Sequence, residues 1–274
     1  MRTLYLECSM GAAGDMLLSA LSELLPEPES FVRMMNELKL PGVEVRREYR
    51  LSAGIRGVYT HVGIYGQEEI CSDILPHHEH NHEGSHINEK GCGQEHTHTH
   101  EEHHHASLED IRLLIENIPV SQAVRQNALA VYQLIAEAES KAHGRPVAEI
   151  HFHEVGMMDA VADIVGVCIL MERLDAEQVI CGPVHVGSGM VRCAHGVVPV
   201  PAPATAIILQ GIPYYGGTIE GELCTPTGAA LLKYFSTSFG PMPVMTTEKI
   251  GIGIGAKEFS AANMLRVFWG ETNI

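Results

Sequence analysis

Apolar residues recur along the chain with the two periods that distinguish helices from strands. Spacings of three and four residues predict helices at about 15–25, 31–38, 108–118 and 120–143. Strand-like runs cover 3–8, 43–51, 55–64 and 178–186, with a closing strand in the segment MLRVFWG near the end. Helices and strands are interleaved, so the pattern predicts an α/β fold of mixed α+β character.

The pattern collapses between Gln67 and Ala106, where eleven histidines between His77 and His105 are interleaved with Glu, Asn, Thr and Gly. Such a segment cannot bury enough apolar surface to fold alone, and we expect a disordered, metal-binding loop. The prediction is therefore a small N-terminal α+β unit (1–66), a histidine-rich loop (67–106) and a larger α/β domain (107–274). Whether the two folded parts pack as one body stays open.

Two histidines and a glutamate stand close together in the strand-like run EIHFHE. Side chains alternate across a strand, so His151 and His153 should share one face while Glu154 lies on the other. Imidazole and carboxylate groups are ligands of transition metals. We therefore expect a metal site at His151, His153 and Glu154, with a histidine buried in the core as the alternative.

The segment after this run predicts a helix at 160–174 that is apolar on almost every side and should be buried. Asp159 is placed to cap this helix, and Asp163 lies one turn further on the same face. Unpaired charges on a buried helix are costly, which favours a functional role for the two carboxylates. For Asp159 alone, a simple capping role stays open.

Two other segments could bind an anion. The turn SMGAAGD, with Gly11, Gly14 and Asp15, joins a strand to a helix, where free N–H groups and the helix dipole favour negative charge. The segment GELCTPTGAALL places Thr225 or Thr227 at a helix N-terminus. Each segment has a plainer interpretation, a tight turn for the first and a helix cap for the second.

One further histidine, His195, lies in the loop GSGMVRCAHG ahead of the proline-rich VPVPAPAT. Ligation or proton transfer explains such a loop histidine better than packing does, although packing stays open. By contrast, GIGIG near the C-terminal end of the chain favours a bend in a sheet over a nucleotide-binding loop.

Composition narrows the class of protein. The net charge of −16 argues against nucleic acid or an anionic membrane surface as partner and suits a protein that handles cations. No run is long enough to span a membrane, and the N-terminus lacks the features of a signal peptide, so we expect a cytoplasmic location. The seven cysteines include no CxxC pair, which predicts reduced thiols.

Taken together, four motifs resemble a known family, the LarC-type nickel insertion proteins of nickel-pincer cofactor biosynthesis. They are GAAGDM, EIHFHEVGMMDAVADIVG, AHGVVPVPAPAT and GELCTPTGAALL, and a histidine-rich insertion precedes SLEDI. The resemblance runs in order from about Leu4 to Gly270. It departs from the family at Met10 and Ala13, where serines are usual, and family members commonly continue into a C-terminal domain.

The resemblance implies a nickel-inserting cyclometallase. Such an enzyme inserts Ni(II) into the pyridinium-3,5-bisthiocarboxylic acid mononucleotide with CTP and Mg or Mn, completing the cofactor of lactate racemase-type enzymes. The CTP site would lie outside this chain, on a companion chain or domain, and we expect a homo-oligomer. The implied roles are a base at Asp159, Asp163 or His195, a phosphate cradle at Gly11, Gly14, Asp15, Thr225 and Thr227, and nickel ligands at His151, His153 and Glu154.

Two hypotheses from other classes remain. The chain could be a nickel or zinc storage protein or metallochaperone that works through its histidine-rich loop. It could also be a metal-dependent hydrolase, since HxH near a strand end occurs in amidohydrolases. The absence of a regular succession of eight βα units argues against the hydrolase.

Overall fold

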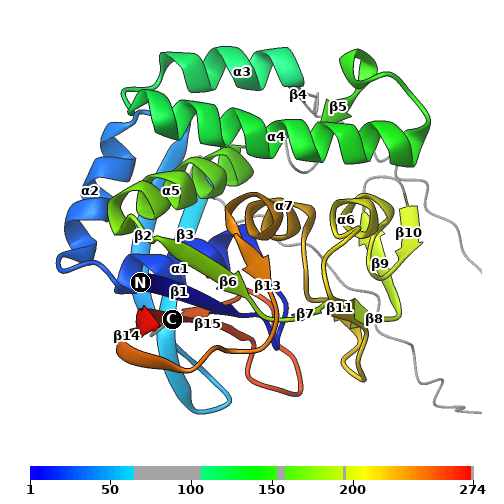
Figure 1. Cartoon of the computed structure of the whole chain (residues 1–274). Helices are drawn as coiled ribbons and strands as arrows, with labels where there is room; N and C mark the ends of the chain where they lie inside the picture. Colours follow the sequence, from blue (N-terminus) through cyan, green and yellow to red (C-terminus); the bar gives the residue numbers. More distant parts are fainter. Residues whose placement is uncertain (65–105, 153–157, 194–195, 273–274) are drawn as a thin grey trace, which may run out of the picture.

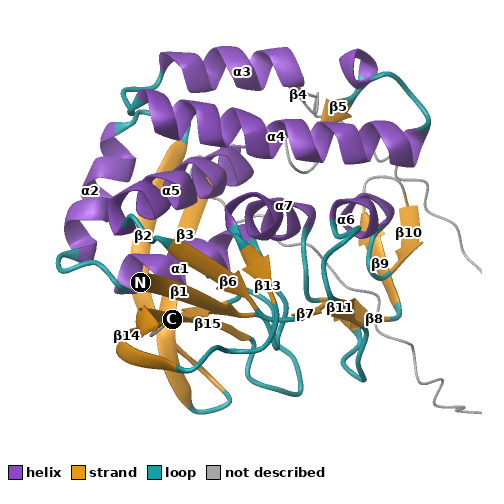
Figure 2. Ribbon diagram, viewed as in Figure 1, coloured by secondary structure: helices purple, strands orange, loops and turns teal. Residues whose placement is uncertain are grey.

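The structure, a computed structural model, describes residues 1–64, 106–152, 158–193 and 196–272. These residues confirm the predicted mixed α/β fold, in which helices are layered on one face of a seven-stranded sheet (Figures 1 and 2). Each helix in the described ranges is too short or too polar to cross a lipid bilayer.

The sheet has the strand order β13-β6-β1-β15-β14-β3-β2. Neighbours are parallel at β13/β6, β6/β1 and β14/β3, and antiparallel at β1/β15, β15/β14 and β3/β2. The sheet therefore contains strands from both sides of the histidine-rich segment, with β1 inserted between β6 and β15. The bounds are β1 Arg2–Glu7, β2 Val43–Ser52, β3 Ile55–Ile64, β6 Gln178–Cys181, β13 Ser238–Phe239, β14 Met245–Ile254 and β15 Met264–Thr272.

The helices agree with the hydrophobic periodicity to within a few residues. They are α1 Gly14–Glu23, α2 Pro28–Glu37, α3 Leu108–Asn117, α4 Gln122–His143, α5 Met158–Leu174, α6 Pro203–Ile208, α7 Pro226–Phe235 and the short 3-10 helix η1 Val147–Glu149. Short strands complete the described fold: β4 Ala106–Ser107, β5 His151–Phe152, β7 Val184–His185, β8 Gly187–Ser188, β9 Met190–Cys193, β10 Gly196–Pro199, β11 Tyr214–Tyr215 and β12 Gly221–Glu222.

Helix α5 is the centre of the helical layer. It packs against α1, α4 and α7, and side chains such as Val161, Ile164 and Cys168 have no exposed surface. This confirms the buried helix expected from its uniformly apolar sequence. The two carboxylates on so apolar a helix, Asp159 and Asp163, are therefore exceptional and call for an explanation.

The glycines of GIGIG let α1 lie directly on strand β14. A Cβ atom added at Gly253 would lie 2.0 Å from the carbonyl oxygen of Met16, and one at Gly251 would lie 2.0 Å from that of Ala20. Helix and strand thus touch backbone to backbone. The motif belongs to the sheet, as the sequence favoured, and it fixes where α1 begins.

One strand prediction was wrong in extent. The strand expected over 178–186 divides into β6 and β7 at Gly182–Pro183, because proline has no N–H to donate to a ladder. The histidine-bearing strand β5 has two residues and pairs with β4, outside the seven-stranded sheet. The N-terminal turn, by contrast, follows β1, which is a strand of the seven-stranded sheet.

We predict that Gly253→Ala destabilises the protein by about 1–3 kcal/mol, because the new methyl group would force α1 off the sheet. Gly240→Ala is the matched control, because a Cβ there meets nothing within 4 Å. Chemical denaturation of both variants measures the difference. Equal midpoints would mean that the contact between helix and strand does not hold α1 in place.

Candidate functional site

The turn after β1 is held against a distant segment by backbone contacts. Gly11 has φ of 78°, and a Cβ atom there would lie 1.9 Å from the carbonyl oxygen of Leu223. Ala12 donates its N–H to that same oxygen (3.0 Å) and accepts from the N–H of Thr225 (3.1 Å). The two segments that the sequence marked separately as anion sites are therefore neighbours.

Helix α7 starts at this contact. Thr225 is its N-cap, as predicted, and the hydroxyl accepts the N–H of Gly228 at 3.2 Å. A Cβ at Gly228 would lie 2.1 Å from the carbonyl oxygen of Ala12, so the N-termini of α1 and α7 abut. Gly14 and Thr227 occupy first-turn positions, whose N–H groups have no partner within their own helix. We call this pair of helix N-termini, Gly11–Asp15 and Thr225–Thr227, the cradle.

The second turn of α5 closes one side of the cradle. A Cβ added at Gly14 would lie 2.5 Å from Oδ2 of Asp163, so a larger residue than glycine would displace the carboxylate. The other oxygen, Oδ1, is buried and has no hydrogen-bond partner among the described residues. An unpaired buried carboxylate oxygen is costly, and a bound proton or cation would lower that cost.

Three carboxylates, Asp15, Asp159 and Asp163, form what we call the acidic centre. Burial raises the pKa of Asp15 to about 6, and the charge of Asp159 adds to this, while the N–H groups of Met16 and Ala256 act in the opposite direction. Burial, followed by the charges of Asp15 and Asp159, holds the pKa of Asp163 well above its ordinary value. Burial also raises the pKa of Asp159. The centre therefore favours a proton or a cation.

Asp159 does not cap α5, contrary to expectation. The helix begins at Met158, so Asp159 lies within the first turn, where its Oδ1 accepts the N–H of Ala160 at 2.7 Å. The apolar pattern alone located the start of the helix two residues too late. From this position the charge of Asp159 still contributes to the raised pKa of Asp15.

The expected metal ligands and one expected base fall elsewhere. His153, Glu154 and His195 lie outside the described residues, and for His151 the structure describes only the backbone, in β5. Within the described ranges, no group of three histidine, cysteine, aspartate or glutamate side chains is spaced to hold a metal ion. The nickel ligand set therefore stays a prediction.

The sequence reasoning missed a cluster of thiols beneath the cradle. Cys8 follows β1, Cys181 ends the parallel neighbour β6, and their Sγ atoms are 3.7 Å apart. The hydrogen bond to Cys181, together with burial, raises the pKa of Cys8 well above its ordinary value, so the thiol stays protonated. Both cysteines stand at the ends of strand-like runs, which is the signal that could have paired them. Every cysteine in the described ranges is free, as expected.

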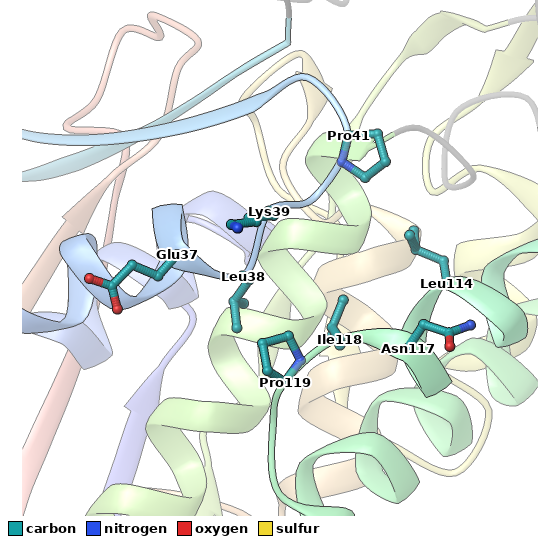
Figure 3. A pocket seen from close by; sticks show the side chains of 8 residues that line it. All are labelled: Glu37, Leu38, Lys39, Pro41, Leu114, Asn117, Ile118 and Pro119. Carbon is teal, nitrogen blue, oxygen red and sulfur yellow. The ribbon is translucent and has the colours of Figure 1, made fainter.

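A surface pocket lies apart from these groups, between the C-terminal ends of α2 and α3 (Figure 3). Its volume is about 430 Å³. None of the cradle or acidic-centre residues lines it, so it takes no part in their chemistry. Its lining is Glu37, Leu38, Lys39, Pro41, Leu114, Asn117, Ile118 and Pro119.

Comparison with known proteins places these features in context. Residues 4–274 match the protein family described as nickel insertion protein. The chain is 37% identical over 271 residues to the pyridinium-3,5-bisthiocarboxylic acid mononucleotide nickel insertion protein of Desulfitobacterium hafniense, covering 99% of this chain and 59% of the relative. Identically named proteins of Geobacillus kaustophilus (38% over 272 residues, 99% and 60%) and Staphylococcus epidermidis (35% over 266 residues, 97% and 58%) are also similar.

The chain thus spans about three fifths of the length of these curated relatives. No solved structure matches it significantly.

The acidic centre predicts an unusual dependence of stability on pH. Because the pKa of Asp15 is about 6 when folded and about 3.8 when unfolded, the folded state alone holds this proton between those values. The free energy of unfolding should fall as pH rises through that window. Above pH 6, Asp15→Asn should therefore be more stable than the unsubstituted protein, by about 2 kcal/mol, and the gain should fade below pH 4.

Thermal melts at pH 4 and pH 7.5 test this, with Glu37→Gln as the control that removes the same charge from an exposed site. If Asp15→Asn were no more stable at pH 7.5 than the unsubstituted protein, burial of the charged Asp15 carboxylate would not destabilise the folded state.

Proposed function

The chain belongs to the nickel insertion protein family, and from this membership we propose that it inserts nickel into the pyridinium-3,5-bisthiocarboxylic acid mononucleotide. The product is the nickel-pincer cofactor of lactate racemase-type enzymes, and the reaction depends on CTP. Relatives named for this insertion align with nearly the whole chain, which supports the proposal. Because they are longer, we assign the CTP site, with its Mg or Mn, to a companion chain or domain.

The observation that carries the proposal is the acidic centre bordering the cradle. The substrates are a divalent cation and a mononucleotide with a phosphate, which need opposite kinds of site. First-turn N–H groups at Gly14 and Thr227 suit a phosphate. The carboxylates of Asp15 and Asp163, one of them with an unpaired buried oxygen, suit a cation.

Forming a nickel–carbon bond releases a proton from the pyridinium ring. The ring C–H bond breaks, its electron pair forms the bond to nickel, and a base takes the proton. Asp159 and Asp163 are candidates, because a carboxylate whose pKa is raised is a better proton acceptor near neutral pH than an ordinary one. His195 remains the third candidate.

Nickel reaches this place from the segment immediately before α5. His151, His153 and Glu154 precede Asp159 by few residues, so ligands on that segment could pass a cation to the acidic centre. Borderline imidazole ligands suit Ni(II). The histidine-rich loop would raise the local supply of metal without being part of the reaction.

A second candidate function is nickel or zinc storage, or metallochaperone activity. The eleven histidines between His77 and His105 favour it, since HxH pairs bind metal without a fixed scaffold. Storage gives no role to the buried carboxylates.

Nickel insertion by the purified chain is the direct test. The thiolated pyridinium mononucleotide, Ni(II) and CTP are supplied with or without the remaining portion of a longer relative, and the nickel–carbon product is followed by its absorbance. We expect product with that portion present. Asp163→Asn should lower the rate at least about 100-fold if it is the base, with Glu37→Gln as the control.

Deleting residues 77–105 separates the two candidate functions. Insertion should survive at saturating nickel, with a higher nickel requirement, whereas storage capacity should be lost. A chain that binds many nickel ions yet yields no product in any combination would favour storage.

In that shortened chain, His151→Ala with His153→Ala should abolish tight stoichiometric nickel binding measured by calorimetry. His61→Ala with His143→Ala removes two imidazoles from other elements and should leave it intact. Unchanged binding after the first pair of substitutions would exclude this segment as the nickel ligand.

A further inference from the structure

Two short parallel strands, β7 and β11, lie beyond the end of β1 and bring an imidazole against a phenol (Figure 1). His185 and Tyr215 are register partners, and their rings stack with centroids 4.8 Å apart and planes 7° from parallel. The imidazole is 6% exposed, whereas Tyr215 remains 43% exposed. One face of the phenol is thus supported from below while the residue as a whole stays accessible.

The imidazole beneath Tyr215 is fixed in place. Its Nδ1 lies 2.9 Å from the carbonyl oxygen of Ser9, which can only accept, so Nδ1 carries the hydrogen. Its Nε2 is buried and has no hydrogen-bond partner among the described residues. The hydrogen bond between Nδ1 and Ser9 and the stacking with Tyr215 therefore hold the imidazole in one orientation.

The glycines after Tyr215 complete this arrangement. A Cβ atom at Gly217 would lie 2.2 Å from Nε2 of His185, so only glycine lets the chain pass the edge of the ring. The sequence YYGG therefore encodes a rigid stack, and a ligand ring would meet a surface that needs no rearrangement.

Hydrogen bonds join this stack to the cradle. His185 donates its N–H to the carbonyl of Cys8 (3.0 Å), and Val186 donates to that of Tyr215 (2.9 Å). Leu223, whose carbonyl contacts Gly11, donates its own N–H to Val186 (3.2 Å). Strand β7 thus lies between the N-terminal turn and β11, which puts the two about two strand spacings, roughly 10 Å, apart.

We propose that the accessible face of Tyr215 binds the pyridinium ring of the mononucleotide while the cradle holds its phosphate. This deepens, and rests on, the proposed function. A pyridinium ring is flat and positively charged, so a phenol face attracts it both by stacking and by its π-electrons. Neighbouring Tyr214 is equally exposed, at 45%, but alternation along the strand points it to the other face.

We call this ring-binding face of Tyr215 the platform. Calorimetry on the full chain with nicotinate mononucleotide, a pyridinium mononucleotide, tests it. Tyr215→Leu should weaken binding about 10-fold, while Tyr215→Phe, which keeps the ring, should stay within about 3-fold. Tyr214→Leu is the matched control and should not change the affinity. Uridine monophosphate, whose base is uncharged, should bind the unsubstituted chain more weakly and lose less affinity on Tyr215→Leu.

In the insertion assay, Tyr215→Leu should raise KM for the thiolated mononucleotide about 10-fold and leave kcat within about 3-fold. Circular dichroism and thermal melts confirm that each variant is folded, and Tyr215→Met replaces Tyr215→Leu if that variant does not fold.

Equal affinities of Tyr215→Leu and Tyr214→Leu, or no binding of nicotinate mononucleotide by the unsubstituted chain, would overturn the platform. Nickel insertion with an unchanged KM would overturn it while leaving the proposed function intact. Tyr215-dependent binding without insertion would support the platform and remove the proposed function.

Discussion

Close contact of backbone with backbone, made possible by glycine, is the constraint on which the candidate site depends. Gly11 touches Leu223, Gly228 touches Ala12, and Gly14 touches the carboxylate of Asp163. A side chain at Gly11 or Gly228 would push the two backbone segments apart, and one at Gly14 would displace the Asp163 carboxylate. Because of these contacts α1 and α7 begin at one place, and the second turn of α5 brings the Asp163 carboxylate to it.

The same contacts create an electrostatic cost that the fold alone does not relieve. Asp15, Asp159 and Asp163 repel one another in a poorly solvated place, and helix dipoles from α1 and α5 compensate only in part. Like charges held together this way are a sign of function more often than of structure. A passing divalent cation would be attracted strongly, yet it would meet no complete set of ligands among the described residues.

The local sequence pattern was sufficient to predict the helices and strands but not the candidate site that they form together. Periodicity located α4, the hairpin of β2 and β3, and the uniformly buried α5, and the N-cap at Thr225 followed from residue type. Local pattern could not show that Thr225 would bond to Ala12, because that contact joins segments more than 200 positions apart in the sequence. The glycines that permit these contacts can be seen in the sequence, but the residues that they contact cannot. His185 escaped notice because a single histidine in an apolar run carries no local signal.

The pairing of β1 with β15 also governs when this protein can fold. Arg2 faces Glu271 across the ladder, so the strand made first must wait for the strand made last among those described. At about 5–20 residues per second of synthesis, that wait is roughly 10–50 s. During this time the edge of β1 that pairs with β15 keeps its backbone N–H and C=O groups unpaired, and the cradle cannot close because β15 and β14 pack against α1. The emerging chain therefore depends on protection from aggregation, and the site is assembled only when synthesis of this region is nearly complete.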